Sequence, residues 1–315
     1  MIGQRESFGR CTGLCPKPTC SHIWPQPKGA CSPRGRKFIS DRKRGWLALS
    51  GERGNGQERI VLMEDLTWEE FRDRASLEPV ILPVGSTEQH APHLPLGTDV
   101  IISRGIAVML AKRVGAMVAP PVCYGYKSQP GSGGGPLFPG TISLEGVVLT
   151  LLVRDVLREL IGDGVQKILV LNGHFENEAF LMEAADLALK DLPATSPRPK
   201  VLVASWWDQI SPEVLRRVFS EVPFPGWALE HAAITETSLV MYLCPEKVRL
   251  AKLDGEISYT PRSYSVFPVP VGFVPESGRL FTARSSSAEK GELLARDIVE
   301  NLARILESEF QGEGR

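Results

Sequence analysis

Five residues of metal-binding type fall in two short clusters, and each cluster follows a run of apolar residues. The first cluster is Glu88 and His90, with Asp99 nearby, after the run 80–84. The second is His174 with Glu176, after the run 167–171. In an extended segment, residues i and i+2 point to the same side, so each cluster can direct two side chains into one cavity. The spacing therefore predicts a polar site where the two clusters meet.

The residue types favour a pair of divalent ions. Two imidazoles and three carboxylates are more ligands than one tetrahedral ion takes, but they suit two ions about 3.5–4 Å apart that share a carboxylate. A single histidine or glutamate after a strand is more often a turn or surface residue, so the prediction depends on the five together. Zinc accepts mixed nitrogen and oxygen ligands, and carboxylate-rich sites also accept manganese. We expect two divalent ions per chain, Zn²⁺ and/or Mn²⁺, and a hydrolase that uses them.

Strand-like and helix-like segments alternate along the chain and must position these residues. Continuously apolar strands joined by helices are typical of a mostly parallel sheet covered on both faces. We therefore expect an α/β fold with three layers, α/β/α, in which ligands gather beyond the carboxyl ends of the strands. The expected strands are 79–84, 116–120, 167–172 and 200–206, and the expected long helices are 99–114, 144–162, 177–190 and 287–308.

The glycine-rich stretch 123–140 is the one long irregular segment within this pattern. It lacks the arrangement of a phosphate-binding loop, and no helix starts at its glycines. Long loops in a compact domain are usually functional or mobile, so we interpret it as a loop that lines the substrate site.

Charge divides the chain into two parts. Residues 1–59 hold 12 Lys and Arg against 4 Asp and Glu, whereas the remainder holds 24 against 33. The first part also has few periodic apolar residues and cannot offset the entropy of ordering. We expect residues 1–62 to form a disordered basic extension and residues 63–315 to form the metallohydrolase domain. The alternative for the extension is a translation start placed too early, since Met63 precedes the first domain-like residues.

The basic extension raises two other classes of function. Its four cysteines and His22 could form a small zinc knuckle, but the positions 11, 15, 20 and 31 complete no finger pattern. A nucleic-acid-associated protein would use the positive charge, but the rest of the chain is acidic and carries no binding motif. We expect neither nucleic acid nor a membrane as a partner. No stretch resembles a secretory signal or a membrane span, so a cytoplasmic location is expected.

The same residues carry a family resemblance. The segments 83–99 and 172–177 resemble the two signatures of the creatininase family, and the resemblance extends from about Leu66 to about Phe310. Blocks at 124–129, 132–135, 138–141 and 226–238 are closer to creatininase itself than to the family at large. The resemblance implies a creatininase-type cyclic amidohydrolase that opens creatinine to creatine through attack of a metal-bound hydroxide on the ring carbonyl. It also implies a small-molecule substrate and a homo-oligomer, by resemblance a hexamer.

The resemblance further implies a role for each residue. Glu88 and His174 would hold one ion, His90 and Glu176 the other, and Asp99 would bridge the two. His231 and Glu176 are the candidate catalytic residues, with His231 delivering a proton to the leaving nitrogen. The candidate substrate contacts are Ser132, Phe175, Trp207, Trp227 and His231. For Trp207, Trp227 and His231 the alternative is a place in the core, and His93 is expected to pack near the site without binding metal.

Two positions expected to contact the substrate depart from the creatininase pattern, and Ala232-Ala233 also stands where creatininase has two glycines after the active-site histidine. Phe175 stands where creatininase has a substrate-contacting tyrosine, and Ala228 stands where it has an aspartate after the pocket tryptophan. The loss of one such hydrogen bond in a desolvated pocket changes discrimination by about 1–3 kcal/mol. The alternative function is therefore hydrolysis of a different small amide, a formamide or a lactone-like ring.

Overall fold

The computed structural model describes residues 61–311, apart from 191, 193–197, 254, 256 and 258, together with two short paired strands, β1 (Gly51–Glu52) and β2 (Glu58–Arg59). The cysteines of the expected extension, with the possible zinc knuckle, lie outside the described residues. None of the helices in the described part of the chain has the length and apolar content that crossing a lipid bilayer requires.

A four-stranded parallel sheet lies at the centre of the domain. Its strands run in the order β4 (Met117–Val118), β3 (Val80–Val84), β5 (Lys167–Asn172) and β6 (Lys200–Ser205). The four expected strands are all present. Strand β4 is shorter than the expected 116–120, because Pro120 and Pro121 have no amide hydrogen to continue the ladder.

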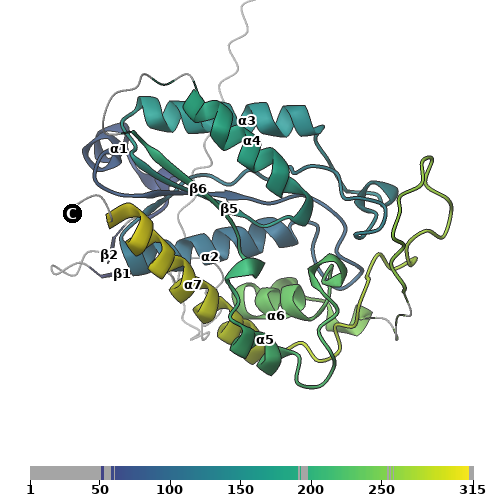
Figure 1. Ribbon diagram of the computed structural model, residues 1–315. Helices are drawn as coiled ribbons and strands as arrows, with labels where there is room; N and C mark the ends of the chain where they lie inside the picture. Colours follow the sequence, from purple (N-terminus) through teal and green to yellow (C-terminus); the bar gives the residue numbers. More distant parts are fainter. Residues whose placement is uncertain are drawn as a thin grey trace, which may run out of the picture. The chain divides into compact units, whose positions relative to one another are not determined.

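Helices cover both faces of the sheet (Figure 1). Helices α2 (Thr98–Val114), α5 (Pro212–Val218), α6 (Ile234–Leu243) and α7 (Ala288–Gln311) gather on one side, and α3 (Gly146–Gly162) and α4 (Glu178–Lys190) on the other. Helix α1 (Trp68–Ala75) joins the second group through Ala75, and Thr67 and Glu70 form the capping box at its start. The predicted three-layer α/β fold is confirmed.

The side chains of the central strands alternate between two cores. Successive residues of a strand point to opposite faces, so each fully buried strand supplies both layers of helices. The residues that face the α2 side are Ile81, Leu169 and Leu171, and those that face the α3 side are Val80, Leu82, Ile168 and Val170.

The register of the sheet brings three loops to one edge. Val84 pairs with Asn172, and Asn172 pairs with Ser205, so β3, β5 and β6 end level with one another. The segments that follow them therefore emerge side by side. Short 3-10 helices punctuate the chain at η1 (Met63–Asp65), η2 (Gly135–Leu137), η3 (Phe175–Asn177), η4 (Trp207–Gln209), η5 (Trp227–Leu229), η6 (Pro245–Lys247) and η7 (Leu250–Lys252).

Candidate active site

Two glycines allow the edge of the sheet to approach the start of α2. Gly85 follows β3, and Gly173 follows β5. A Cβ on Gly85 would lie 2.7 Å from the amide nitrogen of Val100, and one on Gly173 would lie 2.7 Å from the carbonyl oxygen of Asp99. Only glycine tolerates this approach of the backbone. It places Asp99, in the first turn of α2, beside the residues that follow the two strands.

Histidines and acids from both clusters meet at this edge. Nδ1 of His174 lies 3.4 Å from Oε1 of Glu88 and 3.1 Å from Oδ2 of Asp99. Nε2 of His90 lies 2.9 Å from Oδ1 of Asp99 and 3.7 Å from Oε2 of Glu236. Within each of three groups the donor atoms lie within 4.8 Å of one another: Glu88, Asp99 and His174; His90, Asp99 and Glu236; and Glu88, His90 and His231.

The buried atoms of this cluster fit divalent ions. Nε2 of His90 and Oδ2 of Asp99 are buried and have no hydrogen-bond partner among the described residues, although polar atoms lie 2.9 and 3.1 Å away. Close polar atoms without hydrogen-bond geometry are typical of ligands that point at a common ion. Nδ1 of His90 lies 3.2 Å from the carbonyl oxygen of Glu88, which leaves Nε2 for a metal.

The acids and imidazoles hold one another in their charged forms. Burial lowers the pKa of His90, but the carboxylates of Asp99 and Glu236 outweigh it and hold that pKa well above its ordinary value. Burial raises the pKa of Asp99, but His90 and His174 outweigh it and lower the pKa of the carboxyl. The pKa of Glu88 is lowered in the same way by His174, against burial. Ionised, desolvated carboxylates of this kind attract divalent cations.

Glu176 lies at the other ring nitrogen of His174. Its Oε2 is 3.3 Å from Nε2 of His174, and its Oε1 accepts hydrogen bonds from the hydroxyl of Ser132 and, at 3.2 Å, from the amide of Gln129. Burial raises the pKa of Glu176, although His174 lowers it. Within the part of the chain that the structure describes, none of the three donor groups includes Glu176, and Glu236 lies beside His90 instead. This arrangement differs from the ligand division that the resemblance implies.

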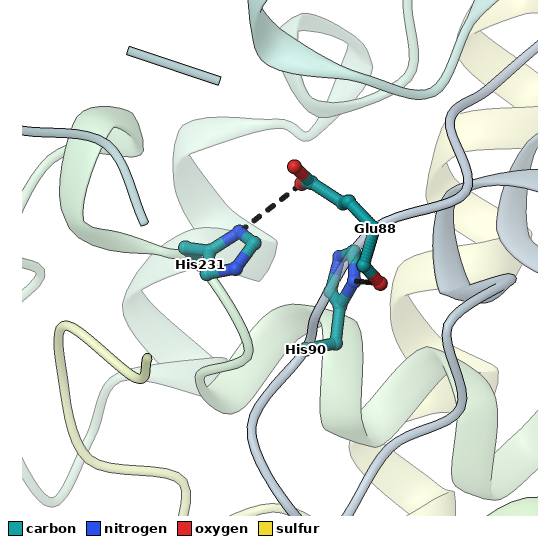
Figure 2. A group of neighbouring side chains, drawn as sticks. All are labelled: Glu88, His90 and His231. Atoms are coloured by element: carbon teal, nitrogen blue, oxygen red, sulfur yellow. Dashed lines mark hydrogen bonds and ion pairs between the residues drawn. The ribbon is translucent and has the colours of Figure 1, made fainter. Parts of the chain in front are cut away.

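His231 faces the donor cluster with one ring nitrogen (Figure 2). Its Nδ1 lies 3.6 Å from Oε1 of Glu88, and its ring centroid lies 4.6 Å from that of His90. Its Nε2 lies 3.0 Å from the carbonyl oxygen of Gln89. The same Nε2 lies 2.8 Å from Nε2 of Gln89, so both polar groups of the Gln89 residue contact this nitrogen while Nδ1 faces the cluster.

The side chain of Gln89 holds three loops around His231. Its Nε2 donates to the carbonyl oxygens of Gly133, at 2.8 Å, and Gly278, at 3.0 Å, and its Oε1 accepts from the amide of Ala91 at 2.9 Å. Gly133 has a φ of 110°, and a Cβ there would lie 2.7 Å from Cδ2 of His231. The glycine-rich stretch thus lies directly against the ring of His231.

A small pocket of about 40 Å³ opens onto the cluster. Aromatic rings form one wall, with centroids 5.8 Å apart for Phe175 and Trp207 and 5.5 Å apart for Trp206 and Trp207. Such a wall favours stacking of a flat ring. All the candidate substrate contacts line this pocket: Ser132, Phe175, Trp207, Trp227 and His231.

Three residues of the site were not predicted from the sequence. His93 was predicted to lie near the site without binding metal. Glu236 and Gln89 were not proposed as functional, and neither was Ser128, whose hydroxyl donates to Glu88. The available signal for Glu236 was its place in a polar segment that also holds Glu230 and His231. His93 is buried, its Nε2 lies 2.9 Å from Oγ1 of Thr237, and it belongs to none of the three donor groups.

The fold and the site together define a class of protein. A parallel sheet between two layers of helices presents, at its carboxyl edge, a buried group of imidazoles and carboxylates at the foot of an aromatic pocket. This is the construction of an α/β protein that holds divalent ions next to a small organic ligand.

Comparison with known proteins identifies the family. The sequence profile of the creatininase family, described as creatinine amidohydrolase, matches residues 64–306. The creatinine amidohydrolase of Pseudomonas putida is 40% identical over 256 residues, which cover 80% of this chain and 98% of that protein. A mycofactocin precursor peptide peptidase of Mycolicibacterium smegmatis is 31% identical over 74% of this chain and 86% of its own length. The chain belongs to the creatininase family.

Solved structures agree with this membership. A glutamate-to-glutamine variant of creatininase in complex with creatine has a TM-score of 0.77 and 39% identity, over 80% of this chain and 99% of that one. Creatininase structures described as a manganese form and as a zinc–zinc type have the same TM-score. Together with the donor cluster, these findings make the chain a metal-binding hydrolase of the creatininase family.

Proposed function

We propose that this chain is a cyclic amidohydrolase that opens creatinine to creatine with two divalent ions, Zn²⁺ and/or Mn²⁺, in each chain. The observation that carries the proposal is the convergence of the donor cluster, His231 and the aromatic wall on one small pocket. The relative that is 40% identical is a creatinine amidohydrolase, which supports the choice of substrate.

The donor groups indicate which residues would hold the ions. Glu88, Asp99 and His174 would hold one, and His90, Asp99 and Glu236 the other, so that Asp99 belongs to both. When bound, divalent ions supply polarisation of the amide carbonyl and lower the pKa of a water molecule.

The remaining residues orient the substrate and move protons. The Nδ1 atom of His231 faces the cluster and is placed to deliver a proton to the nitrogen that leaves when the C–N bond breaks. For Glu176 both predicted roles, metal ligand and catalytic residue, remain proposals. Its raised pKa and the hydrogen bond that it accepts from Ser132 favour the catalytic role, in which its carboxyl carries a proton or accepts a hydrogen bond from a substrate N–H. Trp207 and Trp227 would stack against the flat ring.

A turnover screen tests the proposed reaction. The full chain, loaded with Zn²⁺ or Mn²⁺, is assayed on creatinine and on a small panel of cyclic and linear amides, with creatine formation followed by chromatography. Among amides without a large substituent, creatinine is expected to give the highest kcat/KM. Turnover of another amide, without turnover of creatinine, would change the proposed substrate but leave the proposed metal-dependent amide hydrolysis in place.

Metal analysis tests the ligand assignment. Wild type is expected to bind two ions per chain, Asp99→Ala to lose both, and Glu236→Ala to retain one. Glu176→Gln is expected to retain two, because Glu176 lies outside the donor groups. Loss of one ion in Glu176→Gln, with two retained in Glu236→Ala, would restore the division that the resemblance implies.

A different small amide is the second candidate substrate. Phe175 and Ala228 lack the hydroxyl and the carboxylate that creatininase presents, and both line the pocket. A relative that is 31% identical is named as a peptide peptidase, so the same family also serves amides of another kind.

We also propose a homo-oligomer, a hexamer by family resemblance. Helix α3 supports it, because four large apolar side chains lie together on its first two turns: Val147, Val148, Leu151 and Leu152 are 64%, 48%, 39% and 42% exposed. A second copy of the chain is the partner that would cover such a face in a family of homo-oligomers.

A further inference from the structure

We propose that a second, apolar subsite adjoins the metal pocket and binds a neutral apolar arm of the substrate, such as an aryl or alkyl group. This inference deepens the proposed function and rests on it, because the arm belongs to an amide whose carbonyl occupies the metal pocket. The preferred substrate then extends beyond the metal pocket.

The subsite is a groove that opens directly from the metal pocket. Its volume is about 750 Å³, and four residues line both cavities: Ser132, Phe175, Glu176 and Ala228. The two cavities therefore adjoin at these four side chains, and a ligand anchored at the donor cluster would reach the groove past them.

The floor of the groove is an apolar stripe at the start of α4. Ala179 and Met182 lie three residues apart on one face of α4, and Phe175 lines the same groove from η3, directly before that helix. Phe175 is 45% exposed and Met182 is 53% exposed. Methionine beside an aromatic ring adapts to apolar ligands of varied shape. The opposite wall is the segment 261–265.

The charges around the groove favour a neutral arm over a charged one. Glu178 and Arg262, both exposed, line it with opposite signs, and Glu176 adds an acid at its inner end. The guanidinium of Arg262 lies 4.6 Å from the ring centroid of Phe273, which holds it against an aromatic face. A charged arm of either sign would lie near one like and one opposite charge and would have to be desolvated, whereas a neutral arm carries no such cost.

The two departures from the creatininase pattern at expected substrate contacts lie at the junction of the two cavities. Phe175 and Ala228 each line the metal pocket and the groove. A carboxylate at position 228 would have to be desolvated by an arm that passes beside it, which is costly, whereas a methyl group is not. The two replacements therefore remove two polar groups from the junction, where Ser132 and Glu176 remain as its polar side chains.

Matched substrates test the subsite. Creatinine is compared with two analogues that carry a benzyl group, on the ring nitrogen or on the ring carbon, and with a carboxymethyl analogue. In the metal-loaded full chain, the better benzyl analogue is expected to exceed creatinine in kcat/KM by about tenfold or more, mainly through KM. The carboxymethyl analogue is expected to show no such gain. Because all four compounds contain the same scissile bond, the ratio of their kcat/KM values measures the contribution of the arm alone.

Three variants locate the effect. Met182→Asp adds a charge to the floor of the groove and is expected to bring the benzyl-to-creatinine ratio close to one. Leu250→Asp adds the same charge at a residue that is 51% exposed and lines neither cavity, and should keep the wild-type ratio. Ala228→Asp should also lower the ratio, by raising creatinine turnover and lowering that of the benzyl analogue.

The outcomes separate the subsite from the proposed reaction. Turnover of creatinine with a ratio near one in wild type, or a ratio that Met182→Asp leaves unchanged, would overturn the subsite alone. If no amide is turned over, binding of a benzyl analogue to the metal-free chain is measured by calorimetry. Binding of a benzyl analogue at least about tenfold tighter to wild type than to Met182→Asp supports the subsite without the reaction, and equal binding overturns it.

Discussion

At the scale of single residues, the structure distinguishes two histidines near the site, the half-buried His231 and the buried His93. His231 directs Nδ1 toward Glu88, whereas His93 contacts Thr237. We expect His231→Ala to lower kcat by about 10²–10⁴, the usual cost of losing a general acid or base. Its metal content, measured by elemental analysis, should equal that of wild type. Loss of an ion together with activity would make His231 a ligand, as its place in one donor group allows.

Glu230 gives a second prediction at this scale. It is buried, and burial raises the pKa of Glu230 to about 7, although hydrogen bonds from the hydroxyl and amide of Thr235 lower it. The folded chain then binds more protons than the unfolded chain between pH 4.5 and about 7. The stability that the protonated carboxyl contributes is therefore present at low pH and is lost as the pH rises through 7, by about 3 kcal/mol in total.

Glu230→Gln provides the comparison, because the neutral amide keeps the shape of the carboxyl and does not titrate. Urea unfolding of both proteins between pH 5 and pH 8 should show that wild type loses stability relative to the variant as the pH rises. Parallel stability profiles would mean that Glu230 keeps an ordinary pKa in the folded chain.

At the scale of elements, Gly291 sets the contact between α6 and α7. A Cβ at this position would overlap the carbonyl oxygen of Ser238 in α6. Gly291→Ala should therefore destabilise the chain by about 1–3 kcal/mol through overpacking. Since α6 carries Glu236, the same change should also weaken metal retention at the site with His90. Urea unfolding and metal analysis measure the two effects.

Gly162 is the matched control for this substitution. It is the last residue of α3, and no atom lies within 4 Å of a Cβ built there. Gly162→Ala should be neutral or stabilise by up to about 1 kcal/mol, because it lowers the entropy of the unfolded chain. Equal losses in the free energy of unfolding for Gly291→Ala and Gly162→Ala would show that the contact between α6 and α7 does not cause the destabilisation.

At the scale of the whole molecule, the boundary of the folded domain can be tested by truncation. The carbonyl oxygen of Val61 accepts a hydrogen bond of 2.7 Å from the amide of Val118, and the side chain of Val61 is 5% exposed. A chain that starts at Met63 loses this contact and should be less stable, by about 1–3 kcal/mol, than one that starts at Arg59. Both should keep turnover. Equal stabilities would leave the boundary at residue 63, as predicted from the sequence.

The exposed face of α3 gives a prediction about assembly. Leu151→Asp places a charge in the middle of this face and should shift the oligomer to smaller species at micromolar concentration, as measured by light scattering. Leu77→Asp is the control, since Leu77 is 71% exposed and lies at the end of α1, away from α3 in the chain. A monomeric wild type, or an oligomer that withstands Leu151→Asp, would contradict the proposed interface.

The sequence by itself determined the order of the elements, the parallel sheet and the position of the main ligands. These follow from local properties. Runs of apolar residues mark buried strands, and the carboxyl ends of parallel strands meet at one edge whatever the details of packing. Glu88, Asp99 and His174 were therefore predicted together from their places after β3 and β5, and the motifs around them carried the family.

Only the tertiary structure decided which other side chains complete the site. Glu236 reaches His90 from a helix more than a hundred residues away, and Gln89 joins loops that no local pattern connects. Glu176 lies 3.3 Å from Nε2 of His174, whereas Glu88 and Asp99 lie at Nδ1 of the same ring, so the three donor groups do not include Glu176. Contacts between distant segments depend on how helices pack on the sheet, and spacing along the chain does not encode that packing.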